Sequence, residues 1–334
     1  MRTGPAGRHT PLVNTDLPRH PDPVEPPRPA GLTTRPLTMA DTGAVYRVMA
    51  AQELHDLGSV EIEEADIVGD WQIPGYDVPA CTIGVVDPAT DTLVGYAETG
   101  RSDRGDAAVL PAYRGRGVGT WLAWWMRESA RSRGWARVGM PVPEGGPGDR
   151  LLAGLGYGVR WHSWVLSLPA GASIVERPLP PGYVVRAAEP AEWRAVHRVV
   201  DEAFLEWSER DPEPYEAFAA GTVDRPGFEP WHLRVVVDPD GAVVGAAYVT
   251  VFDGGGSGDP ADRDAFINRL AVRPDQRHRG LAQALMVDAF AVARNHGATS
   301  SGLSTDSRTG ALGLYEKVGM KVTSTWLHRA VALD

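Results

Sequence analysis

One pattern occurs twice in the chain, and the two copies are separated by a constant 163 positions. This offset relates Pro111 to Pro274, Arg114 to Arg277, Gly117 to Gly280, Gly134 to Gly297 and Gly156 to Gly319. Residues 111–156 therefore align with the second copy without a gap. Glycines and prolines fix turns and helix ends, so a register kept through all of them predicts a tandem duplication of one folded unit.

Each copy is long enough to be a domain. The chain has 334 residues, which exceeds the usual size of a single domain. We expect a disordered Pro-rich leader over residues 1–30, one domain over 31–169, a linker over 170–180 and a second domain over 181–334. Hydrophobic periodicity predicts the same order of elements in both domains, with a hairpin and a strand before a long helix that ends at Gly134 or Gly297.

Composition excludes several kinds of partner. The formal net charge is −10, from 33 basic and 43 acidic residues, which disfavours a nucleic-acid partner because Lys and Arg supply that affinity. There is no apolar run of membrane-spanning length and no apolar signal core, so we expect no membrane partner. Cys81 is the only cysteine and cannot form an internal disulfide, which favours a reducing compartment. The prediction is a cytoplasmic protein, monomeric or a homodimer.

The repeated motif has the same surroundings in both copies. A predicted strand and a Pro-containing turn lead into RGRGVG at 114–119 and RHRGLA at 277–282, and a predicted helix follows. Small residues let backbone N–H groups approach a ligand, and the free N–H groups at the start of the helix point to the same place. This arrangement suits a pyrophosphate group. It lacks the Gly-Lys-Ser/Thr of a P-loop and the acidic partner of a Rossmann fingerprint.

At these residues the sequence resembles the GCN5-related N-acetyltransferase (GNAT) superfamily, whose acetyl-CoA motif is Gln/Arg-x-x-Gly-x-Gly/Ala between its fourth strand and third helix. The resemblance covers both halves, and the tandem arrangement is similar to that of the mycothiol synthase family. It implies an α/β (α+β) fold of two tandem GNAT domains. Each would have a central, mostly antiparallel mixed sheet flanked by helices and splayed at strands 4 and 5. It also implies transfer of an acyl group from acetyl-CoA, or another acyl-CoA, to an amine.

The resemblance assigns the co-substrate contacts residue by residue. In the C-terminal half they are Leu270, Ala271, Val272, Arg277, His278, Arg279, Gly280, Leu281, Ala282, Gln283 and Ser307, of which Ser307 stands where the family has Asn. In the N-terminal half they are Val109, Arg114, Gly115, Arg116, Gly117, Val118, Gly119 and Thr120. Motif-loop backbone N–H groups would hold the pyrophosphate, and the strand before the loop would hold the pantetheine arm. No metal is implied, since His197, His232 and His278 lack ligand spacing.

Amine acylation needs an acid for the departing thiolate and a base for the attacking amine. The family's acid is usually a Tyr in a Leu-Tyr-x-x-x-Gly-Phe pattern, and residues 314–320 read LYEKVGM, which points to Tyr315. For the base, Asp264 lies on the same predicted strand face as Asn268, where it could orient a water, and Glu206 lies after the first helix of the C-terminal domain. The sequence leaves the choice between them open.

The two halves differ at the acid. The position equivalent to Tyr315 in the N-terminal half is Leu152, which has no hydroxyl to protonate a thiolate. We therefore expect the C-terminal domain to catalyse and the N-terminal domain not to. The favoured function is acetylation of a primary amine of a small molecule. Two alternatives remain open: acetylation of a cysteinyl pseudodisaccharide, as in mycothiol synthase, and a non-catalytic acyl-CoA-binding or sensing protein.

Overall fold

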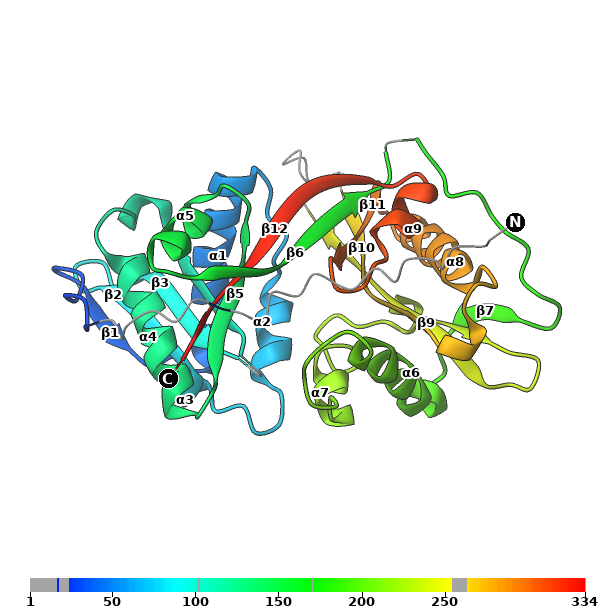
Figure 1. The fold of residues 1–334 in the computed structure, drawn as a ribbon, viewed down its shortest axis with the longest axis horizontal. Coiled ribbons are helices and arrows are strands. Elements are labelled where there is room, and N and C mark those ends of the chain that lie inside the picture. The colour runs from blue at the N-terminus through cyan, green and yellow to red at the C-terminus, as the bar shows by residue number, and fades with distance from the viewer. Residues whose placement is uncertain (1–16, 18–23, 101–102, 170, 254–262, 334) are drawn as a thin grey trace, which may run out of the picture.

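The computed structural model of the chain describes residue 17 and residues 24–100, 103–169, 171–253 and 263–333. Most of the predicted leader, and residue 170 of the predicted linker, lie outside the described residues. The two halves lie side by side along the long axis of the molecule (Figure 1). Within the described part, no helix is both long and apolar enough to cross a membrane.

The N-terminal half begins with a four-stranded antiparallel sheet, in the order β1-β2-β3-β4. The strands of this half are β1 (Thr33–Arg35), β2 (Thr82–Asp87), β3 (Thr92–Thr99) and β4 (Gly105–Val109), which form that sheet, and β5 (Arg137–Pro143) and β6 (Gly158–Ser167). Its helices are α1 (Thr42–Leu57), α2 (Glu64–Trp71), α3 (Val78–Cys81), α4 (Val118–Ser132) and α5 (Pro147–Gly154), with short 3-10 turns at Met39–Asp41 and Pro111–Tyr113.

The C-terminal half repeats this order of elements. Its strands are β7 (Val184–Ala187), β8 (Leu233–Val237), β9 (Val243–Asp253), β10 (Arg263–Val272), β11 (Ser300–Asp306) and β12 (Lys321–Ala332). Its helices are α6 (Trp193–Leu205), α7 (Tyr215–Ala220), α8 (Leu281–Asn295) and α9 (Leu312–Lys317), with 3-10 turns at Pro190–Glu192, Pro230–His232 and Pro274–Gln276. The predicted long helices correspond to α4 and α8, and each is followed within two residues by its glycine, Gly134 or Gly297.

The last strand of each half completes the sheet of the other half. β12 pairs antiparallel with β5 of the N-terminal half, and β6 pairs antiparallel with β11 of the C-terminal half. β6 and β12 also pair with each other, so the second sheet has the order β5-β12-β6-β11-β10-β9-β8-β7. Figure 1 shows the red β12 reaching into the N-terminal half beside the green β6. The halves therefore share one continuous eight-stranded sheet.

Side chains of the exchanged strands are buried in the opposite half. Leu166 of β6 is fully buried in the cluster beneath α8 of the C-terminal half. Leu327 and Val331 of β12 are buried in the cluster beneath α4 of the N-terminal half. Burial of such a side chain contributes roughly 1.5–3 kcal/mol, so each hydrophobic core depends on a strand from the other half.

The fourth and fifth strands of each half separate along their length. β10 pairs with β11 in parallel only from Asp264–Ile267 to Ser300–Leu303, after which the two strands diverge. Among the described residues, β4 meets β5 only through a parallel bridge between Arg104 and Gly139. The four-stranded antiparallel sheet and the eight-stranded mixed sheet are both flanked by helices, and strands 4 and 5 of each half are splayed, which confirms the fold class predicted from the sequence.

Candidate active site

The motif loops of the two halves have the same backbone form. Gly117 and Gly280 directly precede α4 and α8 with φ of 80° and 81°, in the left-handed region that glycine adopts without steric cost. Two positions earlier, Gly115 and His278 also have positive φ, at 74° and 65°. Each loop therefore directs the unpaired N–H groups of a helix N-terminus toward the opening between the splayed strands.

The motif arginines are held by carboxylates at the C-terminal end of the first helix of each half. Both terminal guanidinium nitrogens of Arg277 donate to Glu206, at 2.6 and 2.7 Å, and its Nε donates to the carbonyl of Val272. In the N-terminal half, Arg114 makes the same paired contact with Asp56 at 2.7 Å. Because the contact recurs in both halves, we interpret it as a clamp on the loop. Glu206 does not enter our proposal as a base, since both of its oxygens are bound to Arg277.

A cavity of about 750 Å³ occupies the splay of the C-terminal half. Most of the co-substrate residues predicted in the C-terminal half line it: Leu270, Ala271, Val272, Arg277, His278, Gly280, Leu281, Ala282 and Gln283. Tyr315, the predicted acid, also lines it and is 8% exposed. Burial raises the pKa of Tyr315 to about 12, so the hydroxyl keeps its proton at neutral pH and can act as a donor.

Three predicted residues do not line this cavity. Arg279 turns aside and donates to Tyr183 Oη at 3.1 Å. Ser307 pairs through its backbone N–H with the carbonyl of His162 on β6. Asp264 lies where β10 and β11 are still paired, and it accepts a hydrogen bond from Ser300 Oγ. Asp264 lies at the closed end of the splay and does not line the cavity, so it does not enter our proposal as a base.

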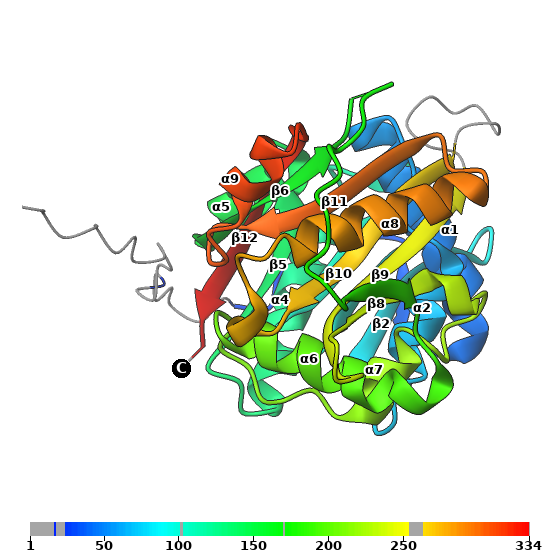
Figure 2. The ribbon, with the colours of Figure 1, turned by 90° about the vertical axis from the view of Figure 1, so that its right-hand side faces the viewer.

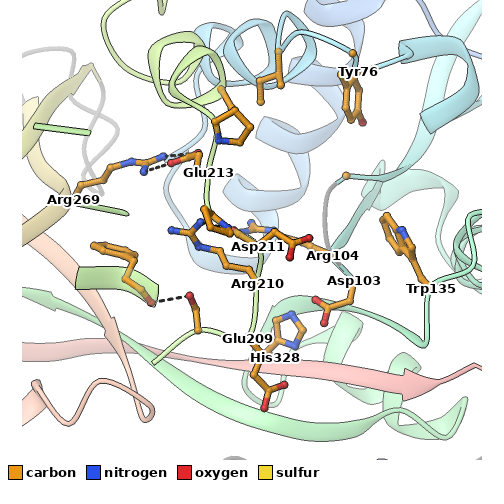
Figure 3. A pocket seen from close by; sticks show the side chains of 18 of the residues that line it. Tyr76, Asp103, Arg104, Trp135, Glu209, Arg210, Asp211, Glu213, Arg269 and His328 are labelled. Carbon is orange, nitrogen blue, oxygen red and sulfur yellow. Dashed lines mark hydrogen bonds and ion pairs between the residues drawn. The ribbon is translucent and has the colours of Figure 1, made fainter. Parts of the chain in front are cut away.

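A larger cavity of about 1090 Å³ lies between the two halves (Figure 3). Its walls carry carboxylates and aromatic side chains from both halves, including Tyr76, Trp135, Glu209, Asp211 and Glu213. Glu213 is paired with Arg269 at 2.8 Å. Arginines such as Arg104 and Arg210 line it too, so the cavity offers hydrogen-bond donors, acceptors and flat apolar surfaces to a polar molecule.

One wall of the larger cavity is a stacked column. Trp161 of β6 stacks on His328 of β12 at 3.8 Å between ring centroids, and Arg308 lies 3.6 Å from the Trp161 ring centre. Burial, reinforced by neighbouring arginines, lowers the pKa of His328 to about 2, so this ring is neutral. The exchanged strands thus build the wall, and the neutral histidine stacks without adding a charge.

The two cavities meet at three residues. Phe204, Trp207 and Asn268 line both of them. Asn268 lies at an irregularity of β10, between Ile267 and Arg269, where the register with β9 shifts. Its amide nitrogen donates to Thr250 Oγ1 at 2.8 Å, which leaves its carbonyl oxygen as an acceptor at the junction. A molecule bound in one cavity and a molecule bound in the other would meet at these three residues.

The splay of the N-terminal half is more closed. The backbone N–H of Val109, which would face the pantetheine arm, donates to Gln52 Oε1 at 3.0 Å. Leu151 of α5 packs on the motif loop, since a Cβ added at Gly119 would lie 2.8 Å from its Cδ2. Arg116 lies over the Tyr113 ring at 4.8 Å, and Leu152 is buried. Internal contacts thus occupy groups that remain available in the C-terminal half.

Several cavity residues were not predicted from the sequence. Ser163 of β6 and Arg177 of the connection to β7 line the C-terminal cavity, and Trp161 and His328 line the larger one. All four lie in or beside the exchanged strands. The alternation of hydrophobic residues in WHSWVLS indicates a strand, but not which sheet it joins, so this contribution could not be predicted from one sequence.

Comparison with known proteins agrees with this geometry. The sequence profile of the acetyltransferase (GNAT) family matches residues 51–143 and 193–320. The mycothiol acetyltransferase of Salinispora tropica is 31% identical over 244 residues, covering 69% of this chain and 75% of that protein. The structure of a GCN5-related N-acetyltransferase from Sphaerobacter thermophilus has a TM-score of 0.67 at 26% identity, covering 91% of this chain and 96% of that one.

A tandem GNAT protein from the clavulanic acid biosynthesis pathway has the same fold, with a TM-score of 0.65 at 16% identity over 90% of this chain and 98% of that one. The fold, the repeated loop and the cavity thus define the class of tandem acetyltransferase-fold proteins. The chain belongs to the acetyltransferase (GNAT) family and is an N-acetyltransferase. This confirms the resemblance found at the two motifs.

Proposed function

We propose that the C-terminal half transfers an acetyl group from acetyl-CoA to a primary amine of a small molecule by direct attack. One observation carries this proposal: the motif loop, the splayed edge of β10 and Tyr315 all line one cavity, and that cavity joins the larger one between the halves. The donor would occupy the first cavity and the acceptor the second. Such an arrangement holds both reactants in position for a single step.

The residues present fit acetyl-CoA. The helix N-terminus behind Gly280 offers unpaired backbone N–H groups to the phosphates, and residues 270–272 offer a strand edge, freed by the splay, to the pantetheine arm. The thioester supplies the acetyl group and the leaving thiolate. Tyr315 gives its proton to that sulfur as the amine bonds to the carbonyl carbon. The amine's own proton passes to a water in the larger cavity, which the side-chain carbonyl of Asn268 orients, and from there to solvent.

We propose that the N-terminal half supports the reaction without performing it. Leu152 has no proton to give, Gln52 occupies the N–H of Val109, and Leu151 packs against the loop. What this half contributes is β6, which pairs with β11 along the splay, and one side of the larger cavity. The resulting enzyme has one catalytic centre built from both halves.

The names of similar proteins favour one particular acceptor compound. Several similar proteins are named mycothiol acetyltransferase, which supports a cysteinyl pseudodisaccharide as the acceptor to test first. The experiment is a CoA-release assay against a panel of small amines that includes this compound, with acetylation confirmed by mass spectrometry. Turnover of a small amine supports the proposal. Acetylation of protein amines alone would contradict it.

A further inference from the structure

The connection between β6 and β7, of which the structure describes residues 168–169 and 171–183, crosses the C-terminal half beside the donor cavity. β6 lies between β12 and β11, whereas β7 forms the far edge of the sheet. The chain must therefore cross the face of the sheet that carries α8 (Figures 1 and 2). It passes the N-terminal end of that helix, the end to which the motif loop leads.

Specific contacts hold this connection on the helix. The side chain of Ile174 is 7% exposed and packs into the cluster beneath α8, and Leu179 packs against the same cluster. The carbonyl of Val175 accepts a hydrogen bond of 2.5 Å from the side chain of Gln283. Beyond it, the Tyr183 hydroxyl donates to Gln276 Oε1 at 2.6 Å. The connection is thus fixed on both sides of the motif loop.

Arg177 lies between these anchors and directly over the loop. A methyl group added at Gly280 would lie 3.6 Å from Arg177 Cδ, and Arg177 lines the donor cavity. Its side chain is exposed. Within the described part of the chain, its guanidinium has no hydrogen bond or ion pair. By contrast, Glu206 holds Arg277, and Arg279 bonds to Tyr183 Oη.

We propose that Arg177 binds the phosphate groups of CoA, so that the connection between the halves forms part of the donor site. The proposal rests on the function proposed above. An uncommitted guanidinium beside a helix N-terminus supplies the planar, charge-assisted donors that phosphate oxygens prefer. The charge and the backbone N–H groups then act on the same anion from two sides. Because the connection begins at β6, donor binding is tied to the strand exchange.

The test is the Kd of acetyl-CoA, measured by isothermal titration calorimetry. Arg177→Ala is expected to weaken binding about tenfold, as for a lost charge-assisted hydrogen bond, and Arg177→Lys by less. Arg198→Ala is the matched control, because Arg198 is an exposed arginine on α6 that lies outside the donor cavity and has no hydrogen bond or ion pair within the described residues. It is expected to bind like the wild type.

A second ligand separates the two phosphate positions. If Arg177 contacts the 3′-phosphate, Arg177→Ala leaves the Kd of acetyl-3′-dephospho-CoA unchanged. If it contacts the pyrophosphate, the substitution weakens both ligands alike. Either result supports the proposal. Wild-type binding of acetyl-CoA with an Arg177→Ala Kd within twofold would overturn the role of Arg177 alone. No binding by the wild type would overturn the proposed function together with it.

Discussion

At the scale of single residues, Tyr315 carries the chemistry that we propose. Tyr315→Phe should lower kcat about 100-fold while the Kd of acetyl-CoA stays within twofold, because only the proton donor is lost. Since the pKa of Tyr315 is raised to about 12, its deprotonation should not limit kcat at any pH up to about 10. Steady-state kinetics across this pH range measure both effects.

Tyr248→Phe is the matched control for this substitution. Burial also raises the pKa of Tyr248 to about 12, but Tyr248 packs in the cluster beneath α6 and outside the donor cavity. Its removal should leave kcat within twofold. A Tyr315→Phe enzyme with wild-type kcat would contradict the assignment of the acid.

A substitution of Glu206 tests whether this residue holds Arg277 in place or acts as the general base. Glu206→Gln should weaken acetyl-CoA binding a few-fold, because the amide holds Arg277 less tightly. It should not change how kcat falls as the pH is lowered (the acidic limb of the kcat–pH profile), because Glu206 is not the base. Asp56→Asn removes the equivalent contact in the N-terminal half and should leave the kinetics unchanged. If Glu206→Gln abolished the acidic limb and lowered kcat 100-fold or more, Glu206 would be the base after all.

Glu98 makes stability depend on pH. Burial, followed by the nearby Asp106, raises the pKa of Glu98 to about 7, while Trp71 Nε1 donates to it at 2.7 Å. Because folding favours the protonated form, the protein should lose stability as pH rises from the unfolded value, about 4.5, through 7. Glu98→Gln should match the wild type at pH 4 and be roughly 1–3 kcal/mol more stable at pH 8, by urea denaturation. A larger gain at pH 4 than at pH 8 would contradict this.

At the scale of elements, the sequence predicted helices and strands within each half, but not the strand pairing between the halves. Hydrophobic periodicity and glycine positions predicted α4, α8, and the hairpin and strand before each of them, because these signals are local. α2 and α7 were missed, since they are short and follow Pro- or Glu-rich loops. The exchange of β6 and β12 could not be predicted, because alternation marks a strand but not its neighbours.

Substitutions in the exchanged strands test that exchange. Leu166→Ala, on β6, should destabilise the C-terminal cluster, and Leu327→Ala, on β12, the N-terminal one, each by about 2–5 kcal/mol. Because the cores share strands, each variant should unfold in one transition, with coincident far-UV circular dichroism and tryptophan fluorescence. Two separate transitions, with each substitution moving only one, would contradict the shared sheet.

At the scale of the whole molecule, the sequence predicted the lining of the smaller cavity, in the C-terminal half, far better than that of the larger cavity. The loop at 277–282 and Tyr315 lie in two segments that the family motif identifies, and the structure places both on one cavity. The larger cavity combines short pieces of both halves, from Tyr76 to His328, and no sequence motif spans them. It depends on the strand exchange and so could be read only from the fold.

The central claim is that, of the two equivalent motif loops, only the loop at Gly280 binds acetyl-CoA. Gly117→Ala and Gly280→Ala impose the same backbone strain, roughly 1–2 kcal/mol, since φ is 80° and 81°. The most direct measurement is the stoichiometry of acetyl-CoA binding by isothermal titration calorimetry for the wild type and both variants. We predict one acetyl-CoA per chain, retained by Gly117→Ala and lost in Gly280→Ala. Two sites per chain, or equal loss in both variants, would contradict the account.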